Sequence, residues 1–83
     1  MIKIVKFAGT NLYNGDARKG YQAKVLLEQD GVERLIHLPV RGYSTADVIS
    51  KARMWRKIPG NIERLQEAFD NGDTSIKAIQ VKK

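Results

Sequence analysis

The chain contains no cysteine, only one histidine among its 83 residues, and no run of about 18 apolar residues. The lack of cysteine rules out disulfides and thiolate metal sites, and it fits a cytoplasmic location. The short apolar runs predict no membrane-spanning helix, and the first residues show no signal-peptide pattern. We therefore expect a single cytoplasmic domain over residues 1–83 that does not bind a membrane.

Residue types that carry catalysis are equally sparse. His37 lies inside a predicted strand and has no thiol partner, so we predict no catalytic residue and no enzymatic activity. One histidine cannot form a two-histidine metal site. Glu63 and Glu67 are one helical turn apart and could hold a divalent ion, but such a pair is more commonly a solvated helix face. We expect no metal and no cofactor.

Positive charge is the main compositional feature. Fifteen Lys and Arg residues outnumber nine Asp and Glu residues, which gives a net charge of +6. Residues 1–60 hold eleven of the cations and five of the acids, whereas residues 61–83 hold four of each. The excess predicts a polyanion or an acidic protein surface as the partner. Solubility is the alternative explanation, because many small domains carry a net charge of this size.

Alternating apolar residues and turn signals predict three strands in the first half of the chain. The strands are expected at Ile2–Phe7, Tyr21–Gln29 and Val32–Val40. A long loop is expected at Gly9–Gly20 and a tight hairpin turn at Asp30-Gly31. Pro39 indicates that the third strand lies at a sheet edge or ends there. The side chains expected on one face of the second and third strands are Tyr21, Ala23, Val25, Leu27, Val32, Ile36, Leu38 and Val40.

Two helices and a last strand are predicted to follow. The first helix covers Ser44–Lys57 and is ended by Pro59-Gly60. Asn61 is expected to cap a second helix that stops at Asn71-Gly72, and Ser75–Lys82 to form a fourth strand. The predicted fold class is α+β: an antiparallel sheet of about four strands with two helices packed on one face, in the order β-β-β-α-α-β.

The first predicted helix combines an apolar stripe with cations. Ser44 and Asp47 form a capping-box-like start. Trp55 lies on the apolar stripe and is expected in the core, with a surface contact as the alternative. Met54 falls opposite the stripe, and an exposed, flexible side chain of this kind suits a protein interface. The cations of this helix that we predict to contact a partner are Lys51, Arg53 and Lys57.

The loop predicted at Gly9–Gly20 has a basic end formed by Arg18 and Lys19. Beside a sheet, such a loop could contact phosphates through backbone N–H groups and side chains. The loop has no phosphate-loop pattern with a following Lys-Ser/Thr, so a surface loop without a binding role is the alternative.

Four short motifs occur in this order: Gly20-Tyr21-Gln22-Ala23-Lys24-Val25, Asp30-Gly31, Ser44-Thr45-Ala46-Asp47 and Trp55. The arrangement resembles the arm-type DNA-binding domain at the N-terminus of phage tyrosine recombinases. In that family a three-stranded sheet enters the major groove and a helix supports it. The resemblance implies Gln22, Lys24 and Arg34 as the sheet contacts. The chain differs from the family by residues 61–83 and by a less basic third strand.

The chain is also similar, in size and architecture, to small bacteriophage proteins that inhibit CRISPR complexes or host RNA polymerase. That likeness implies binding to a host protein or nucleoprotein without catalysis. Two hypotheses result. The first is a nucleic-acid-binding accessory protein of phage or mobile-element type. The second is a protein-binding inhibitor or adaptor that blocks a host nucleoprotein or nucleic-acid-binding enzyme. In either case we expect a monomer or a weak dimer.

Overall fold

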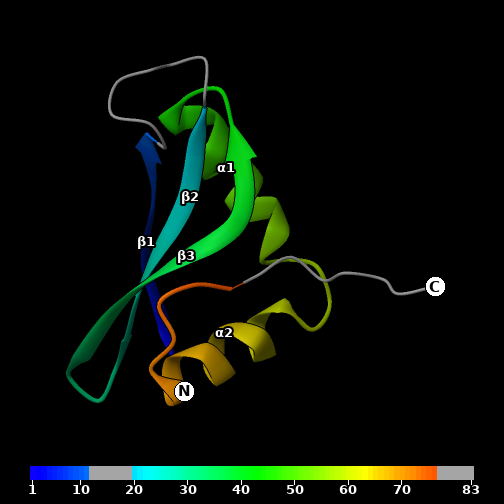
Figure 1. Cartoon of the computed structure of the whole chain (residues 1–83). Coiled ribbons are helices and arrows are strands. Elements are labelled where there is room, and N and C mark those ends of the chain that lie inside the picture. Colours follow the sequence, from blue (N-terminus) through cyan, green and yellow to red (C-terminus); the bar gives the residue numbers. More distant parts are fainter. Residues whose placement is uncertain (12–19, 77–83) are drawn as a thin grey trace.

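Three antiparallel strands and two helices form the part of the chain that the computed structural model describes, residues 1–11 and 20–76. The fold is α+β with an antiparallel sheet, as predicted, and the three strands pair in the order β1-β2-β3 (Figure 1). The elements are β1 (Lys3–Asn11), β2 (Tyr21–Gln29), β3 (Val32–Gly42), α1 (Thr45–Trp55) and α2 (Asn61–Asn71).

The hairpin between β2 and β3 forms at the predicted turn. Asp30 (φ 54°) and Gly31 (φ 83°) both adopt the left-handed backbone region, as a two-residue type I′ turn requires. The turn sets the register, so alternate residues of β2 and β3 share one face. Val32 lies on the expected face of the sheet but is 47% exposed, because it is next to the hairpin turn. The residues of this face that are fully buried are Ala23, Val25, Leu27, Ile36 and Leu38.

The strand β1 extends beyond its predicted end. Residues 9–11, which the glycine-rich sequence assigned to a loop, pair with residues 21–23 of β2. The apolar pattern of β1 ends before this extension, and backbone pairing with β2 continues the strand instead. The remaining part of the predicted loop, residues 12–19, falls outside the described ranges. β3 likewise runs two residues past Val40, to Gly42.

Pro39 lies in β3, an edge strand of the sheet β1-β2-β3, as its missing N–H predicts. The register between β2 and β3 shifts between the pairs Gln22↔Arg41 and Lys24↔His37, the interval that contains Pro39. In this interval Gln22 Nε2 donates a hydrogen bond of 3.0 Å to the carbonyl of Leu38. The side-chain bond thus satisfies a carbonyl where the backbone ladder is irregular.

After α2 the chain returns to the free side of β3. The N–H of His37 donates to the Thr74 carbonyl (2.9 Å), and the N–H of Ile76 donates to the His37 carbonyl (2.8 Å). These bonds form a parallel bridge between His37 and Ser75. Of the predicted fourth strand, Ser75–Lys82, the structure describes this bridge and the buried Ile76. The bridge is parallel, whereas an antiparallel sheet was predicted, because the two helices form a crossover between β3 and this segment.

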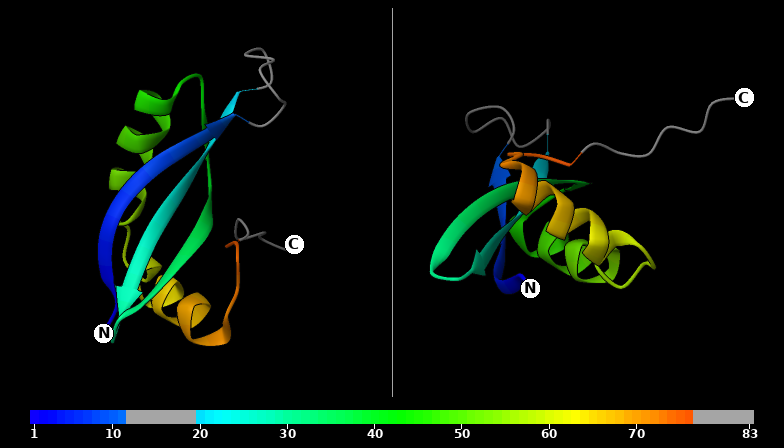
Figure 2. Two further views of the ribbon diagram at one scale, coloured as in Figure 1. Left: turned by 90° about the vertical axis from the view of Figure 1, so that its left-hand side faces the viewer. Right: turned by 90° about the horizontal axis from the view of Figure 1, so that it is seen from below.

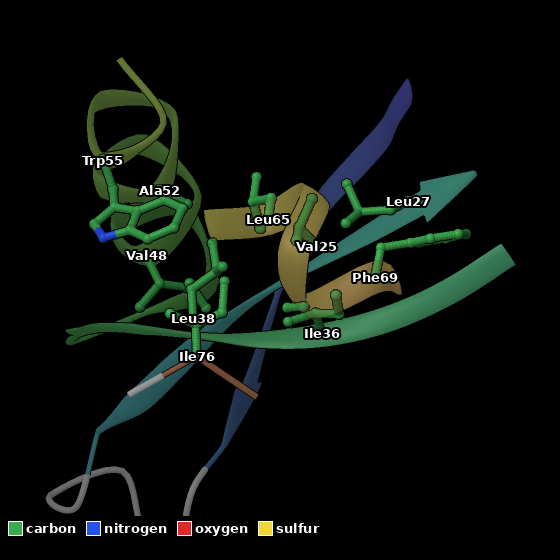
Figure 3. Close-up of a cluster of buried hydrophobic side chains, with 12 residues drawn as sticks. Val25, Leu27, Ile36, Leu38, Val48, Ala52, Trp55, Leu65, Phe69 and Ile76 are labelled. Atoms are coloured by element: carbon green, nitrogen blue, oxygen red, sulfur yellow. The ribbon is translucent and has the colours of Figure 1, made fainter. Parts of the chain in front are cut away.

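Both helices cover the same face of the sheet, as predicted (Figure 3). α1 packs near the end of the sheet at which β1 ends and β2 begins, and α2 packs near the β2–β3 turn. The strands twist between these two ends of the sheet (Figure 2). The helical side chains that join the core are Val48, Ala52 and Trp55 from α1, and Leu65, Ala68 and Phe69 from α2.

The ends of α1 are only partly as predicted. Ser44 is the N-cap, and its Oγ accepts a hydrogen bond from the N–H of Asp47 (3.1 Å). Asp47 Oδ2 in turn accepts from the N–H of Tyr43 (2.9 Å), which completes a variant of the capping box. The helix ends at Trp55, so Lys57 lies in the turn that follows and not in the helix.

Asn61 does not cap α2 as predicted. Gly60 (φ 91°) occupies the N-cap position, and no side-chain hydrogen bond caps the helix there. Asn61 is the first helical residue and is buried. Its Nδ2 donates to the carbonyl of Trp55 (2.8 Å), and its Oδ1 accepts from Arg64 Nη1 (3.2 Å). The side chain therefore binds the C-terminal end of α1 and fixes the turn between the helices.

Replacing Asn61 distinguishes these two roles. Asp is favourable at a helix N-terminus, so Asn61→Asp would be neutral or stabilising if position 61 served only α2. We expect a loss of about 1–2 kcal/mol instead, because a carboxylate cannot donate to the Trp55 carbonyl. Urea denaturation followed by tryptophan fluorescence measures the difference. Asn71→Ala, at an exposed position of the same helix, is the control and should change stability by less than about 0.5 kcal/mol.

Trp55 is the largest side chain that α1 contributes to the core, and it is 9% exposed. We expect Trp55→Ala to lower the free energy of unfolding by about 3–5 kcal/mol, the range for large aromatic truncations in cores. The neighbouring Met54 is 68% exposed, so Met54→Ala should cost less than about 0.5 kcal/mol. Far-UV circular dichroism in urea measures both. Equal stability of the two variants would contradict the assignment of Trp55 to the core.

Candidate functional site

α1 is flanked by two surface depressions, one beside each edge strand. The first lies between β1 and α1 and has a volume of about 560 Å³. We call it the basic groove and define it by the residues that line it, which are Ile4, Val5, Lys6, Phe7, Ile49, Arg53, Arg56 and Lys57. The second lies between β3 and α1, so the helix separates the two surfaces.

The basic groove combines an apolar floor with cations. Ile4 and Phe7 pack against the core from β1, and the register shift between Ile4 and Lys6 leaves Val5 45% exposed. Its cations come from β1 and from the C-terminal end of α1, where positive charge complements the helix dipole. Half of these lining residues are exposed cations, and none of the acidic residues in the described ranges lines the groove; the cations are Lys6, Arg53, Arg56 and Lys57.

Acidic side chains are concentrated elsewhere. Within the described part of the chain, none of the four groove cations has a salt bridge or a hydrogen bond through its side chain. The exposed side of α2 carries Glu63, Glu67 and Asp70, none of which lines the groove. The groove is therefore a site of uncompensated positive charge.

The predicted cluster on the first helix is divided between the two flanks of α1. Arg53 and Lys57 line the basic groove, whereas Lys51 and Met54 line the depression beside β3. Lys51 already has partners: its Nζ lies 3.2 Å from Asp47 Oδ2 and 3.4 Å from the Arg41 carbonyl. A ligand in the groove would thus meet Arg53 and Lys57 but not Lys51 or Met54.

The three sheet contacts implied by the resemblance do not share a face. Gln22 and Lys24 lie on the face that the helices leave open. Arg34 pairs with the buried Leu27 and so lies on the helix side, with its guanidinium 5.3 Å from the centre of the Phe69 ring. The sequence of β3 predicts this placement, because Arg34 lies two residues before the buried Ile36 and alternate residues of a strand share one face.

Two groove residues were not among the predicted contacts. Lys6 lies far from α1 in the sequence; it borders the groove from the edge strand β1, and its pairing with Leu26 places it on the open face of the sheet. Arg56 follows Arg53 at helical spacing, which is the signal that places both on one flank. The predicted loop contacts Arg18 and Lys19 belong to the segment that the structure does not describe.

No protein-family model matches the chain, and no curated protein or solved structure is significantly similar to it. Across residues 1–11 and 20–76, no group of three or more His, Cys, Asp or Glu side chains could hold a metal ion. No helix in those same ranges is long and apolar enough to cross a membrane. Function is therefore inferred from the chemistry of the surface.

Asp47 makes the start of α1 sensitive to acid. The N–H of Tyr43 and then the ammonium of Lys51 lower the pKa of Asp47 below its ordinary value of 3.8. A lowered pKa in the folded state means that the stabilisation is present above the unfolded-state pKa and is lost as pH falls through the folded-state pKa. We expect the free energy of unfolding to decrease below about pH 4, and Asp47→Asn to reduce this decrease. Urea denaturation between about pH 6 and pH 2.5 measures it, and an Asp47→Asn variant with undiminished acid sensitivity would contradict it.

Proposed function

We propose that this chain binds nucleic acid through backbone phosphates, with the basic groove as the main contact surface. The observation that supports the proposal most directly is the grouping of exposed cations in one groove, which no acidic side chain of residues 1–11 and 20–76 lines. Two of these cations, Arg53 and Arg56, carry guanidinium groups, which can bind phosphate oxygens in a bidentate manner.

The remaining chemistry of the groove fits contacts that are independent of sequence. Ammonium and guanidinium groups on phosphates release counterions, which supplies affinity without base readout. The apolar floor, including the Phe7 ring, can contact sugars or unstacked bases of any sequence. The acidic side of α2 repels the same polyanion, so charge orients it toward β1 and α1. The proposed role is that of a non-catalytic accessory protein that binds nucleic acid.

Salt dependence tests the proposal. Replacing Arg53 and Lys57 together by Gln should weaken binding to all oligonucleotide sequences alike and lower the magnitude of the salt slope by about 2, about 1 for each phosphate that is no longer neutralised. Fluorescence anisotropy with labelled single-stranded and double-stranded oligonucleotides, between about 50 and 200 mM salt, gives both quantities. An affinity that does not change over this range would overturn the proposal.

The matched control uses cations on the open face of the sheet. Lys3→Gln with Lys24→Gln removes the same charge, and pairing places both residues on the face opposite the helices. We expect this double variant to keep most of the salt slope. If it loses the slope while the groove variant keeps it, the contact surface is the open sheet face, and the groove assignment is wrong.

The second candidate function is a protein-binding inhibitor or adaptor. It is favoured by a separate observation, the exposed apolar side chains of Met54 (68%) and Ile58 (53%) beside β3. These residues lie on the flank of α1 that faces away from the basic groove, so the two functions do not compete for one surface.

A further inference from the structure

Half of the lining of the basic groove is apolar, and phosphates do not account for that half. The apolar floor of the groove consists of Ile4, Val5 and Phe7 from β1 and Ile49 from α1. The core leaves part of each of these side chains exposed. Val5, at the irregular pairing between Ile4 and Lys6, is 45% exposed. A ligand that contacted only the cations would leave this floor in water.

Single-stranded and double-stranded nucleic acids differ in what they offer such a floor. A duplex presents phosphates and sugars on its outside and keeps the faces of its bases stacked inside. A single strand can turn a base out of the stack and lay it on aromatic and apolar side chains, while its phosphates meet cations. Only the single strand therefore uses both halves of the groove lining.

The shape of the surface also favours the single strand. Proteins that read a duplex insert a protruding element into the major groove, and a recognition helix contacts bases with its N-terminal residues. α1 has no cation before Lys51, and its first turn carries Asp47. Its groove cations instead lie at its C-terminal end, around a depression of about 560 Å³. A space of this size holds an unstacked nucleotide, whereas a double helix can meet only its rim.

We propose that the basic groove binds single-stranded nucleic acid, with one base turned out of the strand onto the apolar floor. The base contacts Val5 and Phe7, and neighbouring phosphates pair with Arg53, Arg56 and Lys57. This inference rests on the proposed function and specifies its ligand. DNA and RNA strands share the phosphates and base faces that the groove contacts, and the contact needs no particular sequence because every base has a π face.

Charge alone predicts the opposite preference. A duplex has the higher charge density, and neutralising one of its phosphates lowers the affinity's dependence on salt by about 0.9, against about 0.7 for a single strand. A surface that only neutralised phosphates would therefore bind a duplex at least as tightly as a single strand of the same length. A preference for the single strand thus reports contacts with bases.

Competition between oligonucleotides tests the proposal. A labelled DNA strand of about 12 nucleotides is displaced from the full chain by four unlabelled competitors, and fluorescence anisotropy at one salt concentration follows the displacement. The competitors are the same strand, its duplex, its RNA counterpart, and a strand whose central nucleotides are abasic. We expect the intact strand to bind about tenfold or more tightly than the duplex or the abasic strand, because stacking one base is worth about this factor.

The abasic strand and the RNA strand answer separate questions. The abasic strand keeps every phosphate, so its salt slope should equal that of the intact strand while its affinity falls. Whichever of the DNA and RNA strands binds more tightly identifies the source of the ligand.

Two variants of the floor leave the net charge unchanged. Phe7→Leu removes a ring and should lower the preference for the single strand over the duplex about fivefold. Phe7 also packs against the core, so the melting temperature of this variant is checked first. Val5→Tyr adds a ring at an exposed strand position and should raise the preference about threefold or more. The matched control is Val32→Tyr, at a residue 47% exposed in β3, and it should leave the preference within about twofold.

The outcomes separate this inference from the proposed function. A duplex that binds as tightly as the single strand, an abasic strand with undiminished affinity, or a Val5→Tyr variant without a gain would overturn the inference. If single and double strands bind alike and Arg53→Gln with Lys57→Gln weakens both, the proposed function stands and only the inference is wrong. If none of the oligonucleotides binds, both are wrong.

Discussion

The close contact of α1 with both edge strands determines the other surfaces of this fold. Val48 is fully buried between Gly9 of β1 and Gly42 of β3. A Cβ atom added at Gly9 would lie 2.6 Å from Val48 Cγ2, and one at Gly42 would lie 3.0 Å from Val48 Cγ1. Neither glycine has a positive φ, so the two positions require a small residue because of space and not because of backbone conformation. With α1 held this close, its two flanks lie beside β1 and β3, where they form the basic groove and the depression beside β3.

The short helices explain why a second constraint is needed. A helix of 11 residues is about 16 Å long, whereas a strand of 9 residues is about 30 Å long, so α1 alone leaves half of the apolar face uncovered. α2 covers the half nearest the hairpin, where Phe69 packs beside Leu27 and Ile36 (Figure 3). Its position is fixed at one end by the buried Asn61 on the Trp55 carbonyl, and further along by Gln66, whose Oε1 accepts from the N–H of Ile2 (3.0 Å). One apolar face therefore needs two helices and a polar connection between them.

Local patterns in the sequence predict the local structure well, and contacts between distant residues account for what they miss. The bounds of β2, the type I′ turn and the Ser44 cap each depend on neighbouring residues, and all are found as predicted. The extension of β1 depends on β2, and the role of Asn61 depends on where α1 ends, so neither is visible in a local pattern. The candidate site shows the same division. Arg53 and Lys57 share a flank because of helical spacing, whereas Lys6 joins them only through the fold.

The distribution of charge favours the basic groove over the open sheet face as the surface for a polyanion. On the open face Lys3 pairs across the strands with Glu28, and Glu28 pairs with Glu33, so acids offset the positive charge at that end. Charges separated by less than the Debye length of about 8–10 Å add, which makes a local group of cations more effective than the same number dispersed among acids. The groove contains such a group at the C-terminal end of α1, and no acid from the part of the chain that the structure describes lines it. On the other flank of α1, the apolar side chains of Met54, Trp55 and Ile58 line the depression beside β3, and the ammonium of Lys51 is already paired with Asp47. Among the described residues, that flank therefore offers a polyanion no group of cations comparable to the basic groove.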